Sequence, residues 1–238
     1  MFKLNFENSR DHLTDADRSL ATKICADSAT ELRILLPSLP DVARVKISTH
    51  GRVIPQVGYG ARSNTTRSVS FSLDPSHASG NARLLHEHLR AALFHECHHL
   101  VRGWCFFGGT RRKRFIDGVV HEGLAVAFER DAAGHAAPWT SYPDNVRDWV
   151  DELLALPVYA PHTKSYAKWM FYHPDGRLLI GYRAGLFIAD RAIAASGLSA
   201  NELAQTSCED IVAMADIALP PASRWRTIFA RAPANAKG

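Results

Sequence analysis

The stretch FHECHHLV, residues 94 to 101, contains two histidines and a glutamate in the order H-E-x-x-H. On an α-helix, residues four positions apart lie about 40° apart around the axis and about 6 Å apart along it. His95 and His99 would therefore turn their imidazoles toward one point, where both can bind a single metal ion. Glu96 would lie beside that point, where it can act as a general base on a water molecule. The spacing predicts a metal centre that carries out hydrolysis.

The third metal ligand is expected from a second segment, HEGLA, at residues 121 to 125. A catalytic zinc ion usually takes three protein ligands and keeps its fourth position open. The stretch of sequence between His99 and Glu122 is long enough for a turn and an antiparallel return of the chain. Its neighbour His121 offers an imidazole, which suits zinc equally well, and spacing alone does not choose between the two.

Small and acidic residues surround Glu122 on the second helix. Gly123 and Ala125 would allow this helix to approach the first one closely. Glu129 shares the helix face of Glu122 and can hold the hydrogen-bond network that orients a ligand imidazole. The alternative for Glu129 is a solvated helix charge paired with Arg130 or another cation.

The two segments resemble the gluzincin metallopeptidases, in which an HExxH helix supplies two histidines and a later helix supplies a glutamate. More narrowly, the chain resembles the YjaZ-like family of predicted zinc-dependent proteases. The pattern of that family is HExHHxxR, then EGLA, then YxxG. The matching segments run from His95 to Arg102, from Glu122 to Ala125 and from Tyr182 to Gly185, and the resemblance covers residues 45 to 210.

This resemblance implies a zincin-like fold, a bound Zn²⁺ ion and a peptide or protein substrate. It implies His95, His99 and Glu122 as the metal ligands, and so favours Glu122 over His121. It also implies Tyr182 as the hydrogen-bond donor to the oxyanion of a tetrahedral intermediate. The alternative for Tyr182 is a hydroxyl that belongs to a buried polar network.

The elements that position these residues are predicted from hydrophobic periodicity. Helical spacing covers most of the first forty residues and both motif segments, and it returns near the C-terminus. Alternating or short apolar runs between the first helix and the motif predict strands. The expected helices are at 15–37, 81–104, 118–134 and 178–195, and the expected strands are at 42–50, 52–63 and 67–75.

The predicted fold is α+β and zincin-like. A small, largely antiparallel sheet packs on the active-site helix, and a mainly helical C-terminal lobe follows. We expect residues 1–104 to form the lobe with the sheet and the active-site helix, and residues 105–238 to form the helical lobe that supplies the third ligand, together one catalytic unit. The strand at 68–75 is expected to be the edge that pairs with an extended substrate.

Composition narrows the class of protein. The chain has 238 residues, 46% of them hydrophobic and 22% charged, as in ordinary globular proteins. Its four cysteines include no CxxC pair and its N-terminus has no signal-peptide pattern, which together predict the cytoplasm. The apolar stretch at 178–195 contains three charged residues, so no membrane span is expected. The net charge of +4 is mild and only RRKR at 111–114 is locally basic, so nucleic-acid binding is not expected.

Other functions stay open. The chain can be a zinc-binding hydrolase that acts on something other than a peptide, or a catalytically silent binding or regulatory module; Glu96 argues against the silent module. A di-iron carboxylate bundle needs two Glu-x-x-His helices, and only residues 96–99 supply one. Peptide specificity, endo- or exopeptidase action and oligomeric state are left open.

Overall fold

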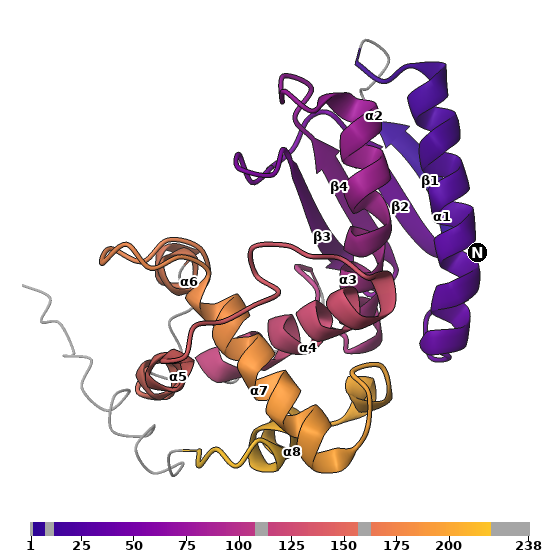
Figure 1. The fold of residues 1–238 in the computed structure, drawn as a ribbon. Coiled ribbons are helices and arrows are strands. Elements are labelled where there is room, and N and C mark those ends of the chain that lie inside the picture. The colour runs from indigo at the N-terminus through magenta and orange to yellow at the C-terminus, as the bar shows by residue number, and fades with distance from the viewer. Residues whose placement is uncertain (1, 8–11, 108–113, 157–162, 220–238) are drawn as a thin grey trace, which may run out of the picture.

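The computed structural model describes residues 2–7, 12–107, 114–156 and 163–219. These residues form a small four-stranded sheet and a set of helices, so the predicted mixture of helices and a small sheet is confirmed (Figure 1). The sheet and its helices occupy one end of the molecule, and the later helices gather at the other end. The predicted division between residues 104 and 105 stays a prediction. The elements on either side pack together through α3 (Arg90–Val101) and α4 (Phe115–Ala133).

The sheet has the strand order β1-β2-β4-β3. β1 pairs with β2 and β2 pairs with β4 in parallel, and only β3 runs antiparallel, against β4. The prediction of a largely antiparallel sheet is therefore wrong. β4 lies between two other strands, so the prediction that it forms the substrate-binding edge is also wrong. The strands span β1 Phe2–Glu7, β2 Ala43–Ser48, β3 Tyr59–Thr65 and β4 Ser68–Leu73.

The parallel pairing follows from a strand that was not predicted. In β1 the apolar residues Phe2, Leu4 and Phe6 alternate with polar ones, and α1 (Asp15–Leu35) comes next. A helix between two strands returns the chain to its starting end, so β2 has to enter the sheet parallel to β1. α1 begins where Thr14 and Asp17 form a reciprocal capping box.

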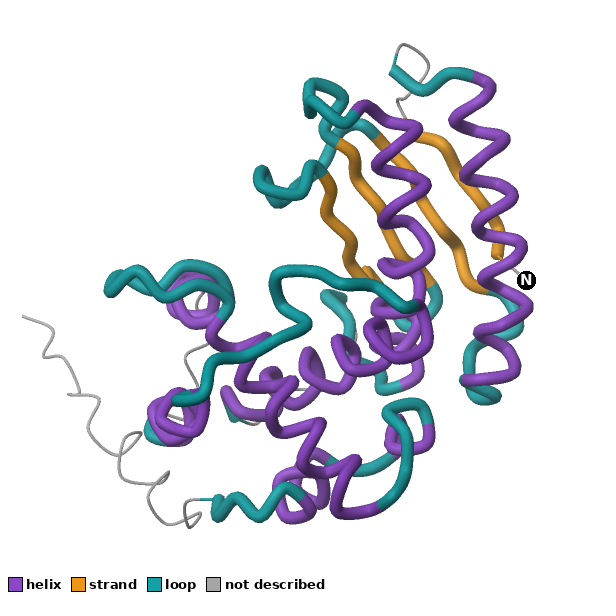
Figure 2. Tube along the Cα trace, viewed as in Figure 1, coloured by secondary structure: helices purple, strands orange, loops and turns teal. Residues whose placement is uncertain are grey.

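One face of the sheet is covered and the other is polar. α1 and the helix that contains the motif lie over the same face (Figure 2). The side chains that meet them include Val45, Ile47 and Phe71, which are almost completely buried. Serines of β4 and charged residues of β2 lie on the opposite face, where Ser70 and Ser72 are nevertheless buried.

The motif lies in a continuous helical run that starts at Gly80. It consists of α2 (Gly80–Leu84), a π-helical turn η1 (Leu85–Leu89) and α3 (Arg90–Val101). The run ends close to residue 104, the predicted end of this helix. There Gly103 has a φ of 66°, a left-handed backbone conformation that residues other than glycine rarely adopt. All of α3 from Ala91 to Leu100 is buried, because the sheet packs on one side and α4 on the other.

The second predicted helix is α4 (Phe115–Ala133), and it packs most extensively on α7 (Ile180–Ser196). A Cβ atom added to Gly123 would lie 2.0 Å from the backbone of Gly185, so the two helices touch backbone to backbone there. Gly123 therefore allows the approach of α7, and not that of α3 as predicted. The remaining helices are α5 Val146–Leu154, α6 Thr163–Met170, the 3-10 turn η2 Glu202–Gln205 and α8 Cys208–Met214.

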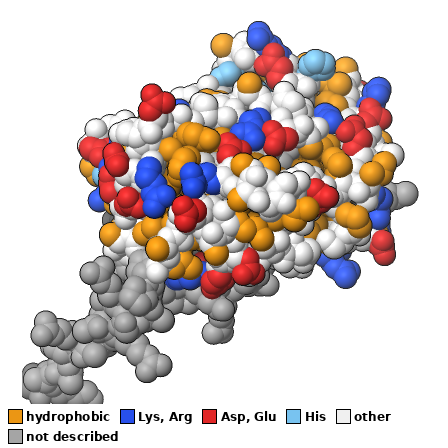
Figure 3. All heavy atoms as spheres, turned by 60° about the horizontal axis from the view of Figure 1, so that its bottom comes forward, with side chains coloured by type: hydrophobic (Ala, Val, Ile, Leu, Met, Phe, Trp, Pro, Cys, Tyr) orange, Lys and Arg blue, Asp and Glu red, His pale blue; other side chains and the backbone are white. Residues whose placement is uncertain are grey.

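No helix in the described part of the chain is both long enough and apolar enough to cross a membrane. All four cysteines carry free thiols, and Cys97 lies in the core. In the predicted basic segment, Arg114 pairs with Asp117 and Glu209, whereas residues 111–113 lie outside the described residues. On the face shown in Figure 3, basic and acidic side chains are interspersed, without a broad field of one sign.

Candidate metal centre

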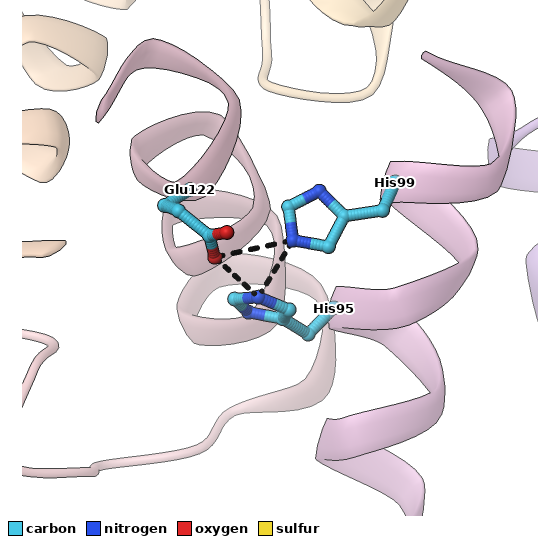
Figure 4. Close-up of side chains that lie close together, drawn as sticks. All are labelled: His95, His99 and Glu122. Carbon is cyan, nitrogen blue, oxygen red and sulfur yellow. Dashed lines mark hydrogen bonds and ion pairs between the residues drawn. The ribbon is translucent and has the colours of Figure 1, made fainter. Parts of the chain in front are cut away.

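Three buried side chains from α3 and α4 converge on one point (Figure 4). The Nε2 atoms of His95 and His99 lie 3.0 Å apart. The Oε2 atom of Glu122 lies 3.3 Å from Nε2 of His95 and 3.2 Å from Nε2 of His99. The residues predicted as metal ligands are thus brought together, and among the described residues they form the group that is able to hold a metal ion.

The spacing of these donor atoms fits a zinc ion. Zinc binds imidazole nitrogen and carboxylate oxygen at about 2.0–2.2 Å with tetrahedral geometry, which puts neighbouring ligand atoms about 3.3 Å apart. The three separations observed here are 3.0, 3.2 and 3.3 Å. Two nitrogens and one oxygen also match the mixed donor sets that zinc accepts in catalytic sites.

Glu122 is positioned by two further hydrogen bonds. Its Oε1 atom accepts from Trp104 Nε1 at 3.2 Å and from the Tyr166 hydroxyl at 3.4 Å. These bonds occupy one carboxylate oxygen and leave Oε2 facing the histidines. His121 points elsewhere, because its Nδ1 accepts from Arg102 at 2.9 Å and its ring stacks on Trp104. Of the two alternatives for the third ligand, the fold brings Glu122 to the cluster.

A chain of polar side chains leads outward from His95. Its Nδ1 atom donates to Glu129 Oε2 at 2.9 Å, which leaves Nε2 directed at the cluster. Glu129 also accepts from His135 Nδ1 at 2.6 Å and from Trp139 Nε1 at 3.2 Å. His135 in turn lies 3.1 Å from His88. Of the two alternatives for Glu129, the structure therefore agrees with a residue that orients the imidazole of His95. It is not a solvated helix charge, since only 2% of its surface is exposed.

The charges of the cluster favour a cation between its members. Burial lowers the pKa of His95, but hydrogen bonds to Glu122 and Glu129 outweigh this effect and raise that pKa well above its ordinary value. Burial raises the pKa of Glu122, but His99 and His95 together hold it well below the ordinary value. Two carboxylates thus stay ionised beside His95, and they stabilise positive charge at this point.

Glu96 lies beside the cluster and does not join it. Its carboxylate is buried, and the backbone N–H of Ser63 in β3 lies near enough to lower its pKa slightly. Burial raises the pKa of Glu96, and the nearby His99 and His95 oppose that shift. A carboxylate whose pKa is raised toward neutrality is better able both to accept and to return a proton.

A pocket opens next to His95 and Glu96. Tyr182 on α7 lines this pocket, so the structure brings the predicted oxyanion donor to the same cavity as the predicted base. Burial raises the pKa of Tyr182 well above its ordinary value, and the nearby Glu122 adds to the shift. The tyrosine is therefore a protonated hydrogen-bond donor at neutral pH.

Other residues of the motif have structural contacts. Arg102 donates to the carbonyls of Leu203 and Ala204, at 3.2 and 3.0 Å, and so ties α3 to the C-terminal elements. His98 is fully buried beside Phe128, and its Nε2 lies 3.1 Å from the carbonyl oxygen of Ala200. Neither residue lines the pocket, so their contacts support the elements around the site.

Comparison with known families places the chain. Residues 47–213, more than half of the 238, match the family described as "Predicted Zn-dependent protease" (DUF2268). The chain belongs to this family. Zinc is accordingly its cofactor, and the buried group of two histidines and a glutamate is a possible site for the ion. The comparisons with curated proteins and with solved structures found no match.

Proposed function

We propose that the chain is a zinc-dependent peptidase of gluzincin type, with a zincin-like fold. In this proposal His95, His99 and Glu122 are the metal ligands, and Glu96 and Tyr182 are catalytic. The observation that carries the proposal is the convergence of three ligand atoms within 4.8 Å of one another, with a buried carboxylate and a pocket beside them. Membership in a family described as zinc-dependent proteases supports it.

Bound zinc supplies a Lewis acid, which polarises the scissile carbonyl and lowers the pKa of a water molecule. Glu96 takes the proton of that water on its carboxylate and passes it to the leaving amine. Tyr182 donates its hydroxyl proton in a hydrogen bond to the developing oxyanion, which lowers the energy of the tetrahedral state.

The residues around the ligands keep the site in one arrangement. Glu129 fixes the ring of His95, and Trp104 with Tyr166 fixes the carboxylate of Glu122. Because this network exists before substrate arrives, little reorganisation is needed during the reaction. The four free thiols favour a reducing compartment, so we propose that the peptidase works in the cytoplasm.

The test is hydrolysis of a fluorogenic peptide mixture by the zinc-loaded chain, with Glu96→Gln as the matched variant. Glutamine keeps the size of the side chain but cannot take a proton. We expect turnover by the unaltered chain and a loss of about 10²–10⁴-fold in Glu96→Gln, with zinc still bound. Equal turnover by both proteins, or none by either, contradicts the proposal.

A further inference from the structure

β3 is one of the two edge strands of the sheet. Its residues alternate between those whose backbone N–H and C=O groups point toward β4 and those whose groups point away from the sheet. The carbonyl of Gly58 accepts from the N–H of Asp74 at 2.9 Å, which makes this a hydrogen-bonded pair with the strand next to it. In an antiparallel ladder such pairs alternate with pairs that have no hydrogen bonds. Gly60 and Arg62 therefore turn their backbone groups toward β4, whereas Tyr59, Ala61 and Ser63 turn theirs outward.

The chain itself occupies both ends of this outward row. The carbonyl of Tyr59 accepts from the N–H of Ile54 at 2.9 Å. The carbonyl of Ser63 accepts from the N–H of Phe106 at 3.0 Å, which closes the row at that end. No hydrogen bond within the described ranges uses the outward N–H or C=O of Ala61. The open edge is thus one residue long.

Ala61 lies in the wall of the pocket that contains His95 and Glu96. Most of the remaining wall is apolar, and the described lining includes no lysine or arginine. Its polar members, besides the proposed ligand and base, are Tyr59, Glu129 and Tyr182. The carboxylate of Glu129 is held by hydrogen bonds within the fold. The apolar lining consists of Ile54, Ala61, Ala92, Trp139, Phe171 and Leu179.

Leu179 is held in this wall in an unusual backbone conformation. Its φ of 58° and ψ of 33° lie in the left-handed region, which a leucine rarely occupies. Its N–H donates to the carbonyl of Phe171 at 3.1 Å, and its own carbonyl starts α7. A glycine would adopt this conformation without strain, so the leucine side chain is retained at a cost to the backbone. The Leu179 side chain forms part of the pocket wall.

We infer that the substrate is a flexible peptide held by two main-chain hydrogen bonds to Ala61 alone, with an apolar side chain next to the scissile bond in the pocket. This inference rests on the proposed function. Because Ile54 and Phe106 close the row on either side, a substrate cannot extend its pairing along β3. Main-chain pairing then contributes little affinity, and the apolar side chain sets the specificity.

The first experiment digests a mixture of proteome-derived peptides with the zinc-loaded full chain and identifies the cleaved bonds by mass spectrometry. Glu96→Gln is run in parallel. We expect aliphatic or aromatic residues to be enriched at one position beside the cleaved bond. Cleavage without such enrichment overturns the inference and leaves the proposed function standing. Identical digests from both proteins overturn the proposed function, and the inference with it.

The second experiment compares Ala61→Pro with Ala61→Ser on one cleaved peptide. Proline removes the outward N–H but no bond to β4, whereas serine keeps the N–H at nearly the same size. We expect kcat/KM to fall about tenfold or more in Ala61→Pro, because the substrate carbonyl loses its donor, and to stay within about twofold in Ala61→Ser. Melting temperature and zinc content confirm folding. Equal kcat/KM in two folded variants overturns the role of Ala61.

The third experiment changes the pocket in a variant that relieves backbone strain. Leu179→Gly suits the left-handed conformation and widens the cavity. We expect the preferred side chain to shift toward larger aromatic residues. Leu178→Gly is the matched control, since Leu178 is half-exposed and does not line the pocket. An unchanged preference in Leu179→Gly overturns the assignment of the pocket.

Discussion

Glu129 connects a proposed zinc ligand to a histidine pair that reaches toward the surface. The sequence suggested a role for Glu129, but nothing in it indicated His135 or Trp139. Both lie just beyond α4, where Gly134 has a φ of 67° and turns the chain back on itself. That turn brings both side chains to the Glu129 carboxylate. Such contacts depend on the path of a loop, which local periodicity does not encode.

Replacing Glu129 with glutamine tests this network. The amide cannot supply the negative charge that stabilises His95 as a ligand, so we expect zinc affinity to fall about 10–100-fold. Competition with a chromophoric chelator measures the affinity. Glu87→Gln is the control, since Glu87 is exposed and lies outside the cluster. An affinity equal to that of the control would show that Glu129 does not support the ion.

Removing the hydroxyl of Tyr182 separates catalysis from binding. If this hydroxyl acts on the oxyanion, Tyr182→Phe lowers kcat about 10²–10³-fold while KM and zinc content stay nearly unchanged. Tyr166→Phe is the comparison, because Tyr166 bonds to the ligand Glu122 and is expected to change zinc affinity instead. A kcat preserved in Tyr182→Phe returns Tyr182 to a purely structural role.

Among the elements, the contact between α4 and α7 sets the position of Glu122. Gly123 follows Glu122 directly, and Gly185 lies against it on α7. The glycines of the EGLA and YxxG segments thus belong to one contact. We expect Gly123→Ala to lower the free energy of unfolding by about 1–3 kcal/mol through overpacking, as measured by urea denaturation.

Gly118→Ala on the same helix is the control for that prediction. Its added Cβ would lie 3.3 Å from the edge of the Trp104 ring and 3.7 Å from the Tyr166 ring, and it would meet no backbone atom among these nearest neighbours. A small shift of the Trp104 ring accommodates the methyl group, and alanine favours the helix. If Gly123→Ala were no more destabilising than Gly118→Ala, the backbone contact between α4 and α7 would not be close in solution.

The sequence predicted the long helices better than the sheet. The helices at 81–104 and 118–134 were found because their periodicity is sustained. β1 is not predicted, although Phe2, Leu4 and Phe6 alternate with polar residues, because the helical pattern of α1 covers most of the first forty residues. Without β1 there was no strand–helix–strand unit to indicate parallel pairing. For the same reason the sequence does not show that β4 lies inside the sheet, between β2 and β3.

At the scale of the whole molecule, the proposed ion joins two parts of the chain. His95 and His99 come from the helix that covers the sheet, and Glu122 comes from the helical part that follows. Their positions could be predicted from motif spacing and family resemblance, because both ligand helices are regular. Glu129 could be predicted in the same way, since it lies on α4. The other polar partners could not, because Trp104 lies in a loop and Tyr166 on α6.

Because the ion is expected to bind the folded chain, removing it lowers thermal stability. At a free zinc concentration about 1,000 times Kd, binding contributes about 4 kcal/mol. For a chain of this size that corresponds to roughly 10 °C in Tm. We expect chelator treatment to lower Tm by this amount and added zinc to restore it. A His95→Ala/His99→Ala variant should show no response to chelator or zinc; a response equal to that of the unaltered chain would place the ion elsewhere.

The most direct test of the central claim is the zinc content of the purified, untagged chain by elemental analysis. The unaltered chain, Glu96→Gln, Glu122→Ala and His95→Ala/His99→Ala are compared. The proposed site predicts one zinc ion per chain, retained in Glu96→Gln, weakened in Glu122→Ala and lost in the double variant. No stoichiometric zinc in the unaltered chain, or zinc retained without both histidines, would contradict the claim.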